Sequence, residues 1–179
     1  EPKNNTNQGI TGQQSNSGLT DNTGNTDVNI NVENLDLTIG EAIAKKVTPS
    51  VVGIRTTVSI QGYFGTQEAS GEGSGVIYTK DGYIITNYHV IGDAVEYGKS
   101  SEILVFLSGD TENGHTATVV GYNISNDLAV LKINAGGLAA IEWADSSKLK
   151  VGQQVMAIGN PGGLEFMGSA TWGIVSGLN

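Results

Sequence analysis

Residues 82–90 read GYIITNYHV, an apolar and β-branched run that ends where the chain turns, at His89. Such a run is typical of a short buried strand. Similar runs recur on both sides of it, separated by Gly, Asn, Asp and Pro and without a long helix between them. This spacing favours an antiparallel barrel or sandwich. The predicted strands cover residues 51–58, 75–79, 83–87, 103–107, 116–122, 128–133, 155–158 and 171–175. Asn113 and Gly114 predict a tight hairpin turn, because both tolerate a positive φ. The fold is therefore predicted to be all-β.

The part of the chain before the first strand divides into two segments. Residues 1–36 are rich in Asn, Gly, Thr and Ser and show no sustained hydrophobic period, which predicts a disordered polar linker. Thr38 and Glu41 then match a capping box, and Pro49 ends the apolar spacing that follows. We predict a short amino-terminal helix of about three turns, packed on the domain by one apolar stripe.

Composition excludes several classes of function. The 179 residues contain 18 Asp and Glu against 9 Lys and Arg, and the net charge of −9 argues against a nucleic-acid partner. The chain has no Cys, which excludes thiolate catalysis, disulfides and Cys-based zinc sites. The 2 His residues do not form a His-Glu-x-x-His frame, so we predict no metal site. No stretch approaches the apolar length of a membrane span.

Two side chains are candidates for proton transfer. His89 ends the strand quoted above, and Asp127 directly precedes the apolar run at 128–133. Each alone has an ordinary reading, as a structural histidine and as a carboxylate that ends a loop. In one barrel the two can cooperate, because a neutral imidazole takes a proton from a nucleophile when a carboxylate holds its other nitrogen. The second histidine, His115, is predicted to be an exposed hairpin residue.

Five segments, in this order, strongly resemble the trypsin-like serine proteases, and most closely their bacterial HtrA branch. They are 71–77 (GEGSGVI), 82–90 (GYIITNYHV), 126–132 (NDLAVLK), 151–162 (VGQQVMAIGNPG) and 173–176 (GIVS). The resemblance implies two six-stranded barrels with the active site between them, with His89 as general base and Asp127 as its orienting partner. It implies that residues 37–149 form a complete first barrel with its helix, and that residues 150–179 begin a truncated second barrel.

Two further features follow from the same resemblance. The loop from Asn160 to Ala170 looks like one that helps shape the active site in this family. Tyr88 departs from the family pattern, because Asn or Ala is expected beside the histidine.

The family's nucleophile lies in a Gly-Asn-Ser-Gly-Gly motif, which this sequence does not contain. Residues 159–163 hold Pro161 where the Ser should stand, and Ser74 lacks the Gly-x-Ser-x-Gly frame. We therefore expect the nucleophile and the oxyanion hole to lie beyond Asn179, and we predict that this chain alone hydrolyses no peptide bond. The start of the second barrel is expected to be loosely ordered or completed by another chain.

For the parent protein, the resemblance implies a serine endopeptidase that acts on unfolded or damaged proteins, assembles as a trimer and carries a downstream PDZ domain. It implies no metal or organic cofactor. The linker at 1–36 fits a spacer behind a membrane anchor, so we expect the parent in the cell envelope, outside the cytoplasm. The alternative is a non-catalytic barrel that binds peptides or partners by strand addition and keeps His89 and Asp127 as a relic.

Overall fold

Helix α1, Ile39–Val47, opens the part of the chain that the structure describes, which is residues 38–178 apart from residue 64 in a computed structural model. The predicted linker at 1–36 lies outside the described residues. Thr38 and Glu41 form the predicted capping box, in which Thr38 N–H donates to Glu41 Oε2 at 2.7 Å and Glu41 N–H donates to Thr38 Oγ1 at 3.3 Å. The helix passes into a 3₁₀ turn, η1 (Thr48–Ser50), which contains Pro49. The short amino-terminal helix is therefore confirmed.

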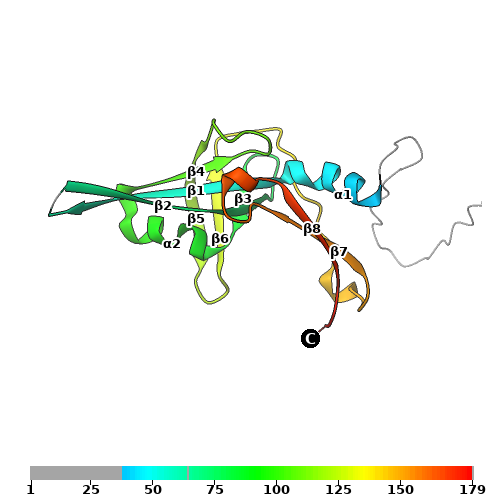
Figure 1. Ribbon diagram of the computed structural model, residues 1–179. Helices are drawn as coiled ribbons and strands as arrows, with labels where there is room; N and C mark the ends of the chain where they lie inside the picture. The colour runs from blue at the N-terminus through cyan, green and yellow to red at the C-terminus, as the bar shows by residue number, and fades with distance from the viewer. Residues whose placement is uncertain (1–37, 64, 179) are drawn as a thin grey trace, which may run out of the picture.

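Six antiparallel strands close into a barrel in the order β1-β2-β3-β6-β5-β4 (Figure 1). Their bounds are β1 Val51–Gly62, β2 Gly65–Ile77, β3 Tyr83–Thr86, β4 Ser101–Phe106, β5 His115–Asn123 and β6 Leu128–Ile133. Alternate side chains point inward: in β6, Ala129, Leu131 and Ile133 are buried and Leu128 is exposed. The fully buried core residues include Val52, Ile54, Ile84, Val105, Leu131 and Ile133. The predicted all-β fold with a complete first barrel is confirmed.

Strands β1 and β2 continue past the barrel as a two-stranded arm, which projects to one side in Figure 1. β4 pairs with β1 only over residues 53–58, and β3 pairs with β2 only over Gly75–Ile77. The sequence predicts much shorter strands here, because residues 59–74 are polar and glycine-rich and lack alternation. Main-chain pairing between β1 and β2 extends to Gly62 and Gly65, and no hydrophobic face in this segment predicts it.

A second helix, α2 (Tyr88–Tyr97), follows β3, where the sequence predicts only a turn. Ile91 and Ala94 are buried, and Val95 packs against the same barrel core. These three residues have the i, i+3, i+4 spacing of an amphipathic helix. Gly92 and the β-branched neighbours have low helix propensity, so packing on the barrel rather than local preference stabilises α2. The prediction of a turn directly after the strand is wrong.

The connection between β4 and β5 is a hairpin, but not the tight turn predicted for Asn113 and Gly114. The loop spans residues 107–114, and neither Asn113 nor Gly114 has a positive φ. The carboxylate of Asp110 organises the loop by accepting from the main-chain N–H groups of Glu112 and Asn113 at 3.0 and 2.9 Å. This local side-chain to main-chain bonding competes with the two-residue turn that the Asn-Gly pair favours.

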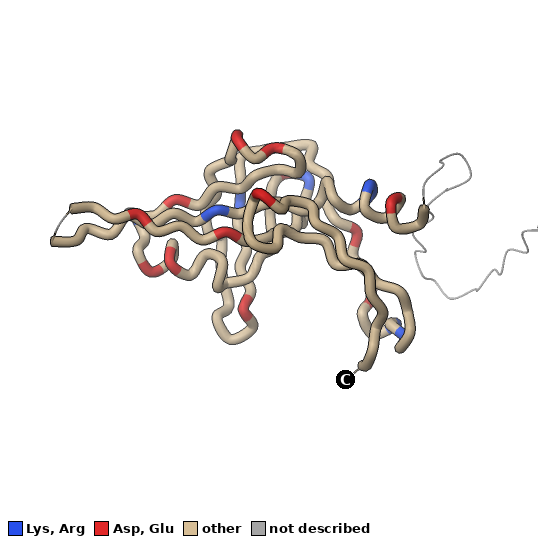
Figure 2. The backbone as a smooth tube through the Cα atoms, in the orientation of Figure 1, with Lys and Arg blue, Asp and Glu red and all other residues tan. Residues whose placement is uncertain are grey.

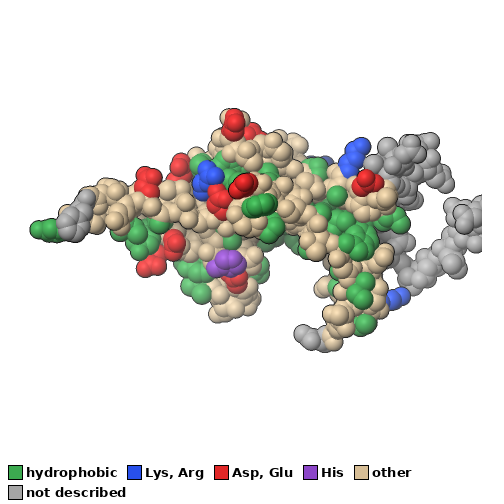
Figure 3. All heavy atoms as spheres, viewed as in Figure 1, with side chains coloured by type: hydrophobic (Ala, Val, Ile, Leu, Met, Phe, Trp, Pro, Cys, Tyr) green, Lys and Arg blue, Asp and Glu red, His purple; other side chains and the backbone are tan. Residues whose placement is uncertain are grey.

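Strands β7 (Gln154–Gly159) and β8 (Ser169–Ile174) form a separate two-stranded sheet. The hairpin lies beside α1, where a Cβ on Gly40 would be 3.6 Å from the Met156 side chain. Figure 3 shows hydrophobic side chains gathered over α1 and this hairpin. The exposed apolar residues of this region include Ile39, Val155, Trp172 and Ile174.

Charge is distributed over the whole molecule rather than in one segment. Figure 2 shows Lys and Arg as scattered points among more numerous Asp and Glu.

Within residues 38–178, residue 64 apart, none of the helices combines the length and apolar character needed to cross a bilayer. The remaining short elements are the 3₁₀ turns η2 (Gly98–Ser100), η3 (Ser146–Lys148) and η4 (Leu164–Phe166).

Candidate active site

The end of β3 and the start of β6 bring the two candidate residues to one end of the barrel. β3 and β6 are antiparallel neighbours, and Thr86 at the end of β3 pairs with Ala129 near the start of β6. His89 comes three residues after Thr86, as the second residue of α2, and Asp127 directly precedes β6. The strand register therefore explains how two side chains 38 positions apart in the chain meet.

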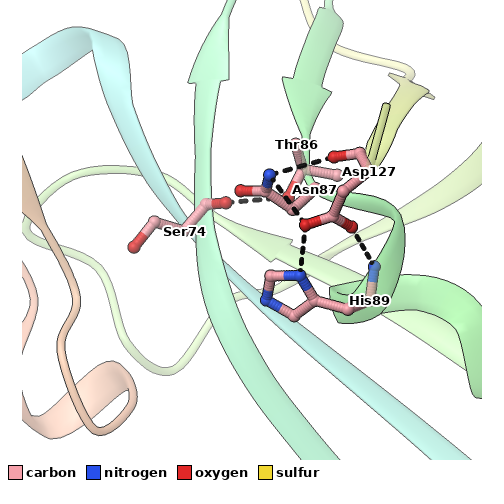
Figure 4. A network of polar contacts seen from close by, with 5 residues as sticks. All are labelled: Ser74, Thr86, Asn87, His89 and Asp127. Carbon is pink, nitrogen blue, oxygen red and sulfur yellow. Dashed lines mark hydrogen bonds and ion pairs between the residues drawn. The ribbon is translucent and has the colours of Figure 1, made fainter. Parts of the chain in front are cut away.

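His89 and Asp127 contact each other through two hydrogen bonds (Figure 4). The ring atom Nδ1 of His89 lies 2.7 Å from Asp127 Oδ2, and the main-chain N–H of His89 donates to Asp127 Oδ1 at 2.9 Å. Both carboxylate oxygens are thus engaged by one residue, which defines the plane of the carboxylate. The His89 side chain is 70% exposed and that of Asp127 45% exposed, so the imidazole is open to an approaching molecule.

The electrostatics favour an ionised Asp127. The hydrogen bond from the His89 main-chain N–H lowers the pKa of the Asp127 carboxyl most, and the His89 ring bond lowers it further, against an opposing effect of burial. An ionised carboxylate can only accept, so Nδ1 of a neutral His89 carries the proton. Nε2 then keeps its lone pair and faces away from the carboxylate, in the state that a general base needs.

Asn87 belongs to the same network and was not among the predicted site residues. Its Nδ2 group donates to the main-chain carbonyl of Asp127 at 2.9 Å and to Asp127 Oδ2 at 3.2 Å. Beside it, Thr86 Oγ1 donates to the carbonyl of Ser74 at 2.8 Å. The signal for Asn87 in the sequence is its place two residues before His89. An Asn in that place is equally consistent with an ordinary helix cap.

The other residues weighed from the sequence lie elsewhere. His115 is the first residue of β5 and pairs with Val105 of β4, and the structure does not bring it to His89. Ser74 accepts a hydrogen bond from the Asn160 main-chain N–H at 2.8 Å through its Oγ, which is a structural role. Tyr88, the departure from the family pattern, places its ring 5.2 Å from that of Tyr122, centroid to centroid.

The loop at 160–168 is fixed to the barrel by the side chain of Asn160, which is 4% exposed. Asn160 Nδ2 donates to the Val52 carbonyl at 2.8 Å, and Asn160 Oδ1 accepts from Gly168 N–H at 3.0 Å. Ser74 connects this loop to β3. Its Oγ accepts from the Asn160 main-chain N–H, and its carbonyl accepts from Thr86 Oγ1, three residues before His89. A cavity of about 210 Å³ lies between barrel and hairpin, and its lining includes Ser74, Asn87, Leu128 and Ile158.

A second anchor of the same loop is an ion pair on the outer face of β1 and β2. Arg55 Nε lies 2.7 Å from Glu72 Oε1, and Leu164 N–H donates to Glu72 Oε2 at 2.8 Å. Burial raises the pKa of Glu72, but the bonds from Leu164 and Arg55 together bring that pKa below its usual value. Leu164 is buried, and a Cβ on Gly53 would collide with its side chain, so a larger residue at position 53 requires the side chains of the loop to shift.

Comparison with known proteins identifies the family. A family model described as "Trypsin-like peptidase domain" matches residues 73–179, which is more than half of the chain. The chain belongs to the trypsin-like peptidase family. The match includes His89 and Asp127 and both β7 and β8.

Relatives of this trypsin-like peptidase domain are proteases of the HtrA and Do-like type, as predicted. "Serine protease Do-like HtrA" of Lactococcus lactis subsp. cremoris is 46% identical over 113 residues, covering 61% of this chain and 26% of that protein. "Serine protease Do-like HtrB" of Bacillus subtilis is 38% identical over 148 residues, covering 76% of this chain and 31% of that protein. The match therefore spans about a quarter to a third of the length of these relatives.

The solved structure titled "Crystal structure of Deg5" is similar in fold. It superposes with a TM-score of 0.60 at 37% sequence identity, over 75% of this chain and 61% of that chain. The barrel and its flanking elements thus have the architecture of a trypsin-like protease related to HtrA.

Proposed function

We propose that His89 and Asp127 are the general base and the orienting carboxylate of an HtrA-type serine endopeptidase. The contact of 2.7 Å between His89 Nδ1 and Asp127 Oδ2 is the observation that carries this proposal. Its support is geometric and electrostatic: the carboxylate is held in one plane, its pKa is lowered first by the His89 main-chain bond, and Nε2 of His89 is left free. The trypsin-like peptidase match and the HtrA-type relatives agree with it.

The proposed reaction is acyl transfer through a serine. The hydroxyl oxygen attacks the scissile carbonyl carbon while its proton passes to His89 Nε2, and the carboxylate of Asp127 stabilises the imidazolium that forms. The imidazolium returns the proton to the departing amine, which leaves an acyl-enzyme. A water molecule then gives a proton to Nε2 and attacks the ester, and Nε2 returns that proton to the serine.

The 179 residues of the chain do not supply the nucleophilic serine of this reaction. We propose that a Gly-Asn-Ser-Gly-Gly motif and its oxyanion hole follow Asn179, in a second barrel that begins near residue 150. The exposed apolar residues of the β7–β8 hairpin support this division, since they offer a face to further strands. The 179-residue chain alone is then inactive, because an isolated His–Asp pair has neither nucleophile nor oxyanion donors.

The substrates proposed for the parent enzyme are unfolded or damaged polypeptides, and the proposed location is the cell envelope outside the cytoplasm. Several relatives bear the name "Probable periplasmic serine endoprotease DegP-like", which supports the location. A trimer and a membrane anchor complete the proposal on the basis of the HtrA resemblance.

The test compares the 179-residue chain with the protein expressed from the native gene read past Asn179. We expect fluorogenic casein to be hydrolysed by the longer protein only, and hydrolysis to be abolished by His89→Ala and by a serine-directed phosphonate. His115→Ala is the matched control and is expected to keep activity. A longer protein that contains a serine motif and still hydrolyses nothing, or one that is unaffected by His89→Ala, would contradict the proposal.

The binding-module alternative has one observation in its favour. β2 pairs with β3 only over Gly75–Ile77, so among the described strands most of its outer edge has no strand partner, and such an edge can accept an extended peptide. In that case the gene past Asn179 lacks the serine motif, and the chain binds unfolded polypeptide equally well with His89→Ala.

A further inference from the structure

Asn87 stands at the amino-terminal cap of α2 but does not cap it. Its main chain has the extended conformation of a cap residue, φ −82° and ψ 146°, yet its side chain makes no bond to the helix. An Asn at this position ordinarily accepts from the second or third N–H of the helix. Here the second N–H, that of His89, is accepted by Asp127 Oδ1 at 2.9 Å. Asp127 caps the helix from the turn between β5 and β6, so the Asn87 side chain is left to bond elsewhere.

The Asn87 side chain instead bonds to Asp127, whose main chain is in the left-handed region. Its φ of 51° is the single positive φ of a non-glycine residue in the described part of the chain. Residues with a Cβ adopt this region uncommonly, and although Asp tolerates it better than most, bonds from its surroundings stabilise it there. Asp127 N–H donates to the Ile124 carbonyl at 3.1 Å, and the Asp127 carbonyl accepts from Asn87 Nδ2 at 2.9 Å. Both main-chain groups of Asp127 are therefore fixed.

We infer that Asn87 is a positioning residue for the proton-handling pair, because one amide group holds both the main-chain carbonyl and the Oδ2 atom of Asp127. Oδ2 is also the atom that lies 2.7 Å from His89 Nδ1, so Asn87 and His89 converge on the same oxygen from two sides. Without the amide, the Asp127 carbonyl and Oδ2 each lose one partner, only the two bonds from His89 still hold the carboxylate, and Asp127 can leave the left-handed region. The Nδ1–H form of His89 then loses its acceptor, and the Nε2–H form, which cannot act as a base through Nε2, gains population.

This inference rests on the proposed function of His89, and the experiment separates the two. The ring tautomer of His89 is measured in the folded 179-residue chain at neutral pH by long-range ¹⁵N–¹H NMR correlation, with His115 as an internal reference. Asn87→Ser is the main variant, since Ser caps a helix as well as Asn but lacks the amide and is too short to reach both oxygens. Asn87→Ala is the second variant.

The matched control is Asn123→Ala at the end of β5, directly before the turn that contains Asp127. Asn123 Oδ1 accepts from Asn126 N–H at 3.0 Å, so the change removes one hydrogen bond from the same loop. We expect the ratio of Nδ1–H to Nε2–H at His89 to fall by about fivefold in both Asn87 variants, the usual effect of losing one hydrogen bond, and to stay within about twofold of the parent chain in Asn123→Ala.

Three results would overturn the inference. If the parent chain is mainly Nδ1–H and both Asn87 variants keep its ratio, Asn87 has no positioning role, while the proposed function survives. If Asn123→Ala lowers the ratio as much as Asn87→Ser, the cause is general loosening of the loop. If the parent chain itself is mainly Nε2–H, the proposed function fails first, and the inference falls with it.

Discussion

Replacing Asn160 by Ala tests whether one buried side chain fixes the loop at 160–168 to the barrel. The Asn160 side chain bridges two units of the molecule, donating to the Val52 carbonyl at 2.8 Å and accepting from Gly168 N–H at 3.0 Å. Val52 is fully buried, whereas Gly168 is partly open to solvent. In Asn160→Ala, water can therefore replace the lost partner at Gly168 more easily than at Val52.

The magnitude follows from these two bonds. A buried carbonyl left without its partner costs about 1–3 kcal/mol, and a partly exposed N–H costs less, so we expect about 3 kcal/mol in total. At 25 °C this is about a hundredfold in the equilibrium between the docked and detached loop. The barrel core does not contain Asn160, so its stability is expected to change much less.

Native-state hydrogen exchange measures this difference residue by residue. The Leu164 amide, which donates to Glu72 at 2.8 Å, reports on the loop, and the Leu131 amide in β6 reports on the barrel. We expect the Leu164 amide to exchange about a hundredfold faster in Asn160→Ala, or at the rate of a free amide if that is reached first. Asn126→Ala, at an exposed position, is the control. Protection at Leu164 within about threefold of the parent chain would refute the reasoning.

Two further predictions concern the barrel and its ion pair. A Cβ on Gly75 would lie 2.8 Å from Ile54 Cδ1 in the core, so Gly75→Ala is expected to destabilise the chain by about 1–3 kcal/mol in thermal unfolding. Gly71→Ala is the control, because a Cβ on Gly71 meets nothing within 4 Å. Equal melting temperatures for the two variants would contradict the packing argument. Because the pKa of Glu72 is lowered in the folded chain, its charge stabilises the fold above the unfolded pKa, and this contribution is lost as the pH falls through the lower folded pKa. The gap in urea midpoint between the parent chain and Glu72→Gln should therefore be widest near neutral pH and narrow below about pH 4.3, the usual Glu value; a gap independent of pH would count against it.

The sequence predicts those parts of the fold in which local pattern and tertiary packing agree. In β6, alternate residues such as Leu131 and Ile133 are apolar and face the core, so the strand is visible from the pattern alone. The helix at Ile39–Val47 is equally visible, because its capping box satisfies its first N–H groups locally.

The elements that were missed depend on contacts distant in the chain. Helix α2 is short and contains Gly92, and burial of Ile91 against the barrel stabilises it beyond its own propensity. The arm formed by β1 and β2 has no hydrophobic face and follows from strand pairing up to Gly62 and Gly65. The arm leaves no periodic signal in the sequence, and the signal of α2 is limited to three residues, Ile91, Ala94 and Val95.

The candidate site divides in the same way. The types and order of His89 and Asp127 predict a proton-handling pair, and the structure places the two side chains in contact. The part played by Asn87 depends on an extended main chain at the cap and on a left-handed Asp127, with φ values of −82° and 51°. No residue type predicts these two main-chain conformations together, so the sequence alone does not distinguish Asn87 from an ordinary helix cap.

The tautomer of His89 in Asp127→Asn tests the central claim, that the Asp127 carboxylate holds the His89 imidazole as a base. Asn tolerates the left-handed conformation, so the main chain at 127 is expected to persist, but its amide can donate to Nδ1. We expect ¹⁵N NMR to show mainly the Nδ1–H form in the parent chain and mainly the Nε2–H form in Asp127→Asn, with His115 unchanged. The same His89 tautomer in both proteins would contradict the claim.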